Sequence, residues 1–196
     1  TEDTPLHFDM DREFQEIYEA TKQYTMNPMV NMYALYKAVD YVAKCGVSGD
    51  FVECGVWKGG SAMIAALTLI ATGDTSRRLW LYDTYAGMSE PTDKDRQGPS
   101  EWPAHPNWRN WQRGEINTWN LAPLEEAKAN VCSTPYPQDK IAFIKGKVED
   151  TIPDSIPDEI AVLHLDTDFY ESTLHELTHL FPRLSPNGVL FVDDYG

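Results

Sequence analysis

Acidic residues follow closely on three apolar segments of the sequence that have the composition of buried β-strands. They are Asp83, Asp166, Asp168, Asp193 and Asp194. In a parallel sheet the carboxyl ends of the strands meet at one edge, and ligands bind there. Because neighbouring carboxylates repel one another unless a cation lies among them, Asp166, Asp193 and Asp194 predict a site for Mg²⁺, Ca²⁺ or Mn²⁺. The alternative is that these acids are solvent-exposed strand ends, which are frequent in so acidic a chain.

A glycine-rich turn, Glu53-Cys54-Gly55-Val56-Trp57-Lys58-Gly59-Gly60, joins a predicted strand to a helix that begins near Ser61. Glycines let a ligand approach the backbone closely, and a helix N-terminus offers free N–H groups. The spacing differs from the dinucleotide fingerprint GxGxxG, so a pyrophosphate would find one glycine too few.

Two carboxylates accompany this turn. Asp83 ends the second predicted strand, where an acid accepts hydrogen bonds from ribose hydroxyls in nucleotide-binding α/β domains. Glu53 adds a second carboxylate at the end of the first strand, which suits a ligand with an amino group and a positive charge better than a phosphorylated one. The alternative is that Glu53 braces the loop and Asp83 caps a turn.

Alternating apolar segments place these residues on an α/β fold. The expected strands are 50–54, 79–82, 141–144, 160–165 and 189–192, and the expected helices include 14–18, 32–42 and 61–70, with others from about residues 121 and 172. Strands alternating with helices predict a doubly wound, mostly parallel sheet.

The length fits one domain, 1–196, with a helical N-terminal cover over 1–46 and an α/β core over 47–196. Since the sequence ends directly after the last predicted strand, we expect C-terminal strands of such a sheet to be missing from it.

Residues 85–120 interrupt the alternation, with little periodicity and four tryptophans, Trp102, Trp108, Trp111 and Trp119. Loops of this length without their own secondary structure are uncommon and often functional. One interpretation is a lid whose indoles supply apolar walls to a site. The other is a surface excursion whose tryptophans pack on the body of the domain.

Composition excludes several classes of function. The chain of 196 residues has a formal net charge of −15 and no basic cluster, so a nucleic-acid partner is not expected. The longest apolar run is too short to span a bilayer, and no signal peptide pattern opens the chain, so no membrane association is expected. Three cysteines without a CxxC pair favour a reducing, cytoplasmic location.

Several blocks of the sequence resemble, in order, those of the macrocin O-methyltransferase family, which includes mycinamicin and novobiocin sugar O-methyltransferases. The blocks are 53–61, 83–88, 146–153, 165–173, 184–188 and 193–196. The pair E-C-G-V-W-x-G-G and L-D-x-D-x-Y-E-S-T is highly specific, and the similarity extends from about residue 27 to the end of the chain. The resemblance implies a Rossmann-like class I methyltransferase that uses S-adenosylmethionine and Mg²⁺.

Residue by residue, the resemblance assigns the methionine end of the cofactor to Glu53 and the glycine turn, the ribose to Asp83, and the edge of the adenine to Val148 and Glu149. The full set of implied cofactor residues is Glu53, Gly55, Val56, Trp57, Gly60, Ser61, Asp83, Thr84, Tyr85, Val148, Glu149 and Asp166. The implied metal ligands are Asp166, Asp193 and Asp194. This chain has Asp166-Thr167-Asp168 where many relatives have Asp-Gly-Asp, and Val148 where many have an aromatic residue.

The expected reaction is methyl transfer to a hydroxyl of a small polar acceptor, such as a sugar of a natural product. Asp166 or Asp168 is the nearest candidate proton acceptor, unless a base lies in the missing C-terminal segment. Two alternatives stay open. Asp166-Thr167-Asp168 is also similar to the motif of haloacid dehalogenase-like phosphohydrolases, and a non-catalytic binding protein could keep the same fold. A homodimer is expected from the resemblance alone.

Overall fold

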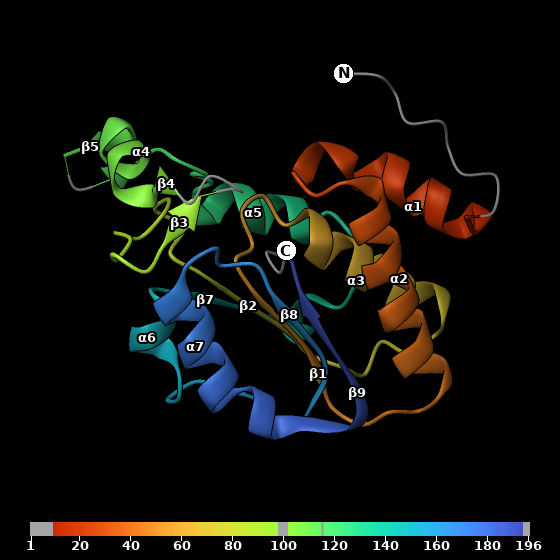
Figure 1. The fold of residues 1–196 in the computed structure, drawn as a ribbon. Helices are drawn as coiled ribbons and strands as arrows, with labels where there is room; N and C mark the ends of the chain where they lie inside the picture. The colour runs from red at the N-terminus through yellow and green to blue at the C-terminus, as the bar shows by residue number, and fades with distance from the viewer. Residues whose placement is uncertain (1–9, 98–101, 115, 194–196) are drawn as a thin grey trace.

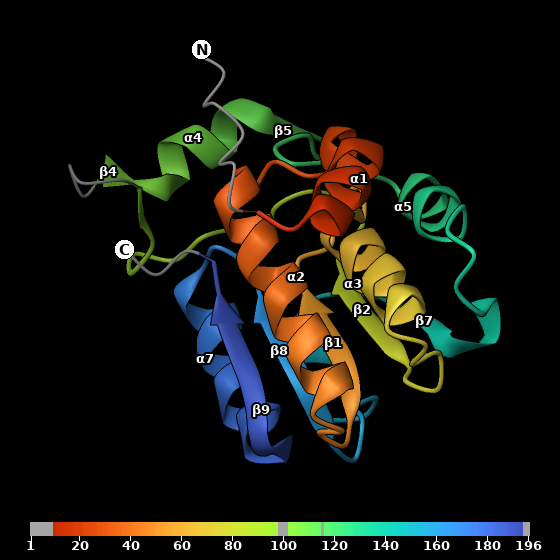
Figure 2. The ribbon, with the colours of Figure 1, turned by 90° about the vertical axis from the view of Figure 1, so that its right-hand side faces the viewer.

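A five-stranded parallel sheet forms the centre of the computed structural model, which describes residues 10–97, 102–114 and 116–193. Its strands are β1 (Asp50–Cys54), β2 (Leu79–Asp83), β7 (Ile141–Lys145), β8 (Ile160–Leu165) and β9 (Leu184–Val192). Figure 2 shows them in the order β7-β2-β1-β8-β9, with every neighbouring pair parallel. The predicted α/β fold with a doubly wound parallel sheet is confirmed.

The order of the strands fixes where a ligand can bind. The chain enters the sheet at β1, moves outward to β2 and β7, and then returns to β8 on the other side of β1. Connections therefore leave β1 and β8 in opposite directions, which opens a crevice beyond their carboxyl ends. β8 is buried along its whole length, as expected of a central strand with helices on both faces.

Helices cover both faces of the sheet (Figure 1 and Figure 2). One face carries α1 (Arg12–Thr21), α2 (Met29–Lys44), α3 (Gly60–Ala71) and α5 (Leu124–Val131), and the other carries α6 (Val148–Thr151) and α7 (Tyr170–His179). The 3-10 turns are η1 (Lys22–Tyr24), η2 (Gln138–Lys140) and η3 (Phe181–Arg183). Within the described part of the chain, no helix is long and apolar enough to cross a membrane.

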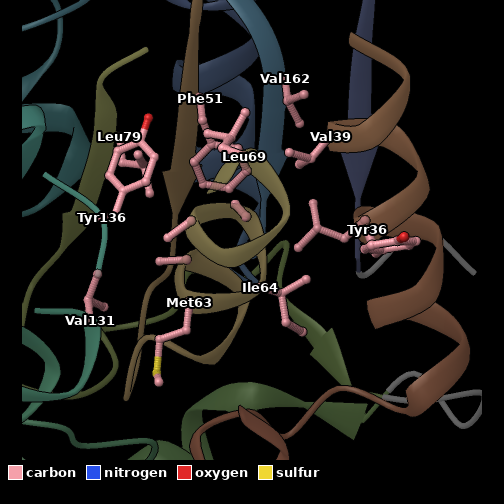
Figure 3. Close-up of a cluster of buried hydrophobic side chains, with 14 of the residues drawn as sticks. Tyr36, Val39, Phe51, Met63, Ile64, Leu69, Leu79, Val131, Tyr136 and Val162 are labelled. Atoms are coloured by element: carbon pink, nitrogen blue, oxygen red, sulfur yellow. The ribbon is translucent and has the colours of Figure 1, made fainter. Parts of the chain in front are cut away.

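The larger hydrophobic core lies between the sheet and the layer of α2 and α3 (Figure 3). Val39 of α2, Phe51 of β1 and Ile64 of α3 are each at most 2% exposed. Helix α3 is buried along most of its length. Its apolar residues Leu67 and Ile70 are only partly buried and pack against the edge of the core. The apolar core holds β1 and α3 rigidly on either side of the glycine turn.

The Trp-rich segment, residues 85–120, has secondary structure of its own, so its prediction as a long irregular loop is wrong. Its elements are the ribbon of β3 (Arg96–Gln97) and β4 (Trp102–Pro103), the helix α4 (Ala104–Trp111), and the ribbon of β5 (Gln112–Arg113) and β6 (Ile116–Asn117). These pieces are too short to show a hydrophobic period in the sequence. Figure 2 shows α4 beyond the carboxyl ends of the strands, where a lid would lie.

Two contacts hold the Trp-rich segment together, and a third joins it to the body of the domain. The indole N–H of Trp108 donates to the carbonyl oxygen of Met88 at 3.0 Å. Gly87 has a φ of +84°, and a Cβ there would lie 1.8 Å from the carbonyl oxygen of Asn117, so only glycine fits. The buried carboxylate of Asp95 accepts the N–H of Tyr170 at 2.7 Å, at the start of α7.

Candidate functional site

A cavity opens beyond the carboxyl ends of all five strands. The glycine turn and the first residues of α3 form one wall, and the segment before α2, residues 24–27, forms another. From the Trp-rich segment, Gly87, Met88, Ser89 and Asn120 contribute to the lining. The described tryptophans of that segment do not, so the prediction that its indoles line the site is not met in the described residues.

Gly55 allows β1 and β8 to approach each other at the base of the cavity. Its φ is +88°, and a Cβ at this position would lie 1.8 Å from the carbonyl oxygen of Asp166. The N–H of Asp166 donates to the carbonyl oxygen of Cys54 at 2.8 Å, which fixes the same approach. The first glycine of the turn is therefore required by the backbone and brings Asp166 next to the turn.

Asp83 organises the glycine turn from the neighbouring strand. Its Oδ2 accepts the N–H groups of Val56 and Trp57 at 2.8 and 3.0 Å, and its Oδ1 accepts the N–H of Tyr85 at 2.6 Å. Burial raises the pKa of Asp83, while these N–H donors oppose the shift. Asp83 thus caps the turn, which is the alternative interpretation that the sequence offers for it.

Asp83 nevertheless keeps room for a ligand. The hydroxyl of Thr84 lies 3.5 Å from Oδ1 of Asp83 but donates its single hydrogen to the carbonyl oxygen of Gly87 at 2.6 Å. Oδ1 therefore has one firm donor, Tyr85, and can accept a further hydrogen bond, and Asp83 lines the cavity. A ligand hydroxyl fits this acceptor.

Glu53 lies beneath the turn and does not line the cavity. It is 1% exposed, and its Oε1 is 3.1 Å from Nδ1 of the fully buried His164. Burial raises the pKa of Glu53, and the hydrogen bond with His164 opposes that shift. Burial would lower the pKa of His164, but Glu53 and the charges of Asp166 and Asp193 raise it overall. His164 is thus a core residue of β8.

Two asparagines hold the acids at the other end of the cavity. Nδ2 of Asn27 donates to Oδ2 of Asp166 at 3.2 Å, and Nδ2 of Asn31 donates to Oδ1 of Asp193 at 2.9 Å. The backbone joins the two acids as well, since the N–H of Asp193 donates to the carbonyl oxygen of Leu165 at 3.0 Å. Asp166 and Asp193 thus face one cavity from neighbouring strands, as the sequence predicts.

The predicted third metal ligand, Asp194, lies outside the described residues. Among the residues that are described, no group of three or more His, Cys, Asp or Glu side chains is arranged to hold a metal ion. Asp166 and Asp193 supply the oxygen donors that hard cations prefer, and both line the cavity. A metal site there stays a prediction.

The cavity is strongly acidic. Its described lining includes Asp83, Glu149, Asp166, Asp168 and Asp193, and a single lysine, Lys147. Such a surface repels phosphates and attracts a ligand with a positive charge. This agrees with the sequence argument against a pyrophosphate.

Most of the residues predicted for the site come together in the cavity. Those that line it are Gly55, Val56, Trp57, Gly60, Ser61, Asp83, Thr84, Val148, Glu149, Asp166, Asp168 and Asp193. Glu53 and Tyr85 do not; Tyr85 is 4% exposed, with its ring in the hydrophobic core and its hydroxyl bonded to the carbonyl oxygen of Leu81. Their contact with a cofactor stays a prediction.

Sequence reasoning missed other residues of the site. Asn31 lies in the first turn of α2, but Asn27 lies in the bend before that helix, so no helical spacing in the sequence links the two. Ser172 and Thr167, which also line the cavity, lie within a recognised block but had no assigned role. Ser172 donates to Oε1 of Glu149 at 2.9 Å.

Comparison with known proteins gives consistent matches. A family model described as Macrocin-O-methyltransferase (TylF) matches residues 5–196. The 8-demethyl-8-(2,3-dimethoxy-alpha-L-rhamnosyl)-tetracenomycin-C 4'-O-methyltransferase of Streptomyces olivaceus is 37% identical over 172 residues, which are 88% of this chain and 62% of that protein. The mycinamicin III 3''-O-methyltransferase of Micromonospora griseorubida is 33% identical over 184 residues, 94% of this chain and 69% of that protein.

A solved structure is also similar to this chain. The O-methyltransferase NovP is 30% identical and superimposes with a TM-score of 0.75, over 88% of this chain and 67% of NovP. The chain thus spans about two thirds of the length of these relatives. With a family model that matches nearly the whole sequence and relatives that share its fold, the chain belongs to the macrocin O-methyltransferase (TylF) family.

Proposed function

We propose that the protein binds S-adenosylmethionine in this cavity and transfers the methyl group to a hydroxyl of a sugar on a natural product. The observation that carries the proposal is the acidic cavity itself. It brings Asp83 and Glu149, beyond β2 and β7, together with a second group of acids at Asp166, Asp168 and Asp193. The names of the relatives, which describe O-methyltransferases of glycosylated natural products, supply the reaction and the substrate class.

The cofactor would lie across the ends of β1, β2 and β7. Oδ1 of Asp83 can accept a ribose hydroxyl, since Thr84 donates its hydrogen elsewhere. Val148 and Glu149 at the far wall would border the adenine. The turn at Gly55 and the start of α3 would face the methionine end, whose positive charges suit the acidic lining. Bound there, S-adenosylmethionine supplies an electrophilic methyl group.

Asp166 and Asp193, with Asp194 as predicted from the sequence, would hold Mg²⁺. Their oxygens fit a hard cation in kind, and both side chains already face the cavity. A divalent cation in this place lowers the pKa of a bound hydroxyl and orients it. Asn27 and Asn31, which now donate to the two acids, restrain their rotamers before any cation arrives.

Asp168 is the proposed proton acceptor for the attacking hydroxyl. It lines the cavity on the turn after β8, and its backbone has a φ of +65°, which an aspartate adopts at a cost. Asp166, two positions earlier in the same turn, also lines the cavity. One acid can then bind the cation while the other takes the proton.

The two alternatives from the sequence carry less support. A phosphohydrolase would bind its phosphate among the acids of this cavity with a single lysine to help, and the family match does not favour it. A non-catalytic protein of the same fold would have no need to place Asp166, Asp168 and Asp193 around one cavity, since gathered carboxylates destabilise a fold.

Cofactor binding tests the first half of the proposal. Isothermal titration with S-adenosylhomocysteine is expected to show one site, and Asp83→Asn should weaken binding by about tenfold, since one charged acceptor is lost. Asp158→Asn, at an exposed carboxylate on the other end of the sheet, is the matched control and should bind like the parent. A titration in which S-adenosylhomocysteine produces no heat of binding would contradict the proposal.

A further inference from the structure

Glu176 is a buried acid that the proposed reaction does not use. It lies on α7, is 0% exposed, and points toward the turn after β8. Its Oε2 accepts the hydroxyl of Thr167 at 3.2 Å, while its Oε1 has no hydrogen-bond partner. A carboxyl group is costly to bury, so this position needs a compensating role.

Thr167 connects this buried acid to the cavity. It stands between Asp166 and Asp168, and all three residues line the cavity. It is also the position where this chain departs from the Asp-Gly-Asp pattern noted in the sequence. A threonine restricts the backbone more than a glycine does, and its hydroxyl can donate a hydrogen bond, which a glycine side chain cannot do.

The turn that carries Asp168 needs such support. Asp168 has a φ of +65°, a left-handed conformation that costs free energy in a residue other than glycine. After it, the N–H of Phe169 donates to the carbonyl oxygen of Thr167 at 2.8 Å, and the N–H of Tyr170 donates to Asp95 at 2.7 Å. Before it, the side chain of Thr167 is held by Glu176.

The environment of Glu176 favours the uncharged form of its carboxyl group. Burial raises the pKa of Glu176 to about 8, and the negative charges of Glu149 and Asp166 act in the same direction, while Thr167 opposes them. Cys54, which is also buried, lies beside it and has a raised pKa because of burial and this neighbour. A neutral carboxyl group can accept the Thr167 hydroxyl without placing another charge behind Asp166.

We propose that Glu176 is a positioning residue, which acts through the hydroxyl of Thr167 to hold the Asp166–Asp168 turn in the conformation that presents Asp168 to the cavity. Glu176 itself touches neither cofactor nor acceptor, because it is fully buried. The contribution of this turn to methyl transfer rests on the proposed function. The conformation of the turn does not, so the two can be tested separately.

Hydrogen–deuterium exchange of the intact protein tests the conformation. Thr167→Val removes the hydroxyl at nearly constant shape, and Glu176→Ala removes its acceptor. Each should speed exchange of the Asp166–Tyr170 amides several-fold, while the amides of α3 stay as protected as in the parent. Glu176→Gln should restore protection, since its carbonyl oxygen can accept the same hydrogen bond. Thr178→Ala, on the exposed side of α7, is the matched control and should change nothing in this turn.

The double variant decides whether Glu176 acts through Thr167. If it does, Thr167→Val with Glu176→Ala exchanges no faster than either single variant, because both remove one interaction. Additive effects, or an effect of Glu176→Ala spread over α7 and the core, would overturn the proposal and leave Glu176 a packing residue.

Turnover provides the second readout. With methyl-labelled S-adenosylmethionine and para-nitrophenyl α-L-rhamnoside as the probe, Glu176→Ala should lower kcat several-fold, leave the KM for the cofactor unchanged, and be rescued by Glu176→Gln. An unchanged kcat in a parent that is active would count against the proposal. A parent inactive on this probe would count against the proposed function, while the exchange experiment would still decide the role of Glu176.

Discussion

Asp168→Asn is expected to lower the rate of methyl transfer by a factor of about 10²–10⁴, the usual contribution of a positioned general base. Asparagine keeps the shape of the side chain and, like aspartate, tolerates the positive φ of this position, so the turn after β8 should persist. The substitution removes the negative charge and, with it, the ability to accept a proton. The measurement is a single-turnover assay at saturating cofactor, which isolates the transfer step from binding.

Binding of S-adenosylhomocysteine provides the control for this variant. Asp168 follows β8, whereas Asp83 ends β2, on the other side of β1, so affinity for the cofactor should stay within about twofold of the parent. A variant that transfers methyl groups at the parent rate would show that the base lies elsewhere. A variant that loses cofactor binding would show that Asp168 belongs to the cofactor wall.

Asp193→Asn is expected to weaken Mg²⁺ binding by about tenfold or more, since weakened metal shells typically lose 10–100-fold. Asn31 now donates to Oδ1 of Asp193, and an asparagine at 193 would keep an oxygen there but remove the charge. The measurement is a Mg²⁺ titration followed by calorimetry in the presence of S-adenosylhomocysteine. Asp194→Asn should act in the same direction if the sequence prediction is right.

The variant Asn31→Ala separates the effect of the charge of Asp193 from the effect of its orientation. Asn31→Ala removes the amide that holds Asp193 without changing the charge of the site, so it should alter Mg²⁺ affinity less than Asp193→Asn does. Superimposable titrations of the parent and Asp193→Asn would remove Asp193 from any metal site. Loss of S-adenosylhomocysteine binding in Asp193→Asn would mean that the cofactor and the acids do not bind separately.

The central sheet could be predicted because its inner strands β1 and β8 are buried almost throughout. Ile160–Leu165 is apolar at every position except His164, which is typical of a strand buried on both faces. The acids that follow these runs could be placed together for the same reason, since parallel strands end at one edge. Asp83, Asp166 and Asp193 therefore meet in the cavity as expected.

The roles of individual acids were harder to predict, because they depend on how deep each side chain lies in the sheet. Glu53 is the penultimate residue of β1 and pairs with Leu81, whereas Asp83 is the last residue of β2. Glu53 is therefore buried against His164, while Asp83 reaches the turn and the cavity. The sequence pattern does not carry that detail.

Partners from distant segments could not be predicted either. Asn27 reaches Asp166 across 139 positions of the sequence, and Asn31 reaches Asp193 across 162. The short ribbons of the Trp-rich segment were missed because two-residue strands leave no periodic signal. Both features arise only when the folded sheet brings the segments together.

Methyl transfer from isotopically labelled S-adenosylmethionine to a set of rhamnosides and related glycosides, followed by mass spectrometry, tests the central claim most directly. The account predicts that label appears on a sugar hydroxyl, that transfer requires the protein, and that Asp168→Asn abolishes most of it. Tight binding of S-adenosylhomocysteine without transfer to any hydroxylated acceptor, with or without Mg²⁺, would contradict it.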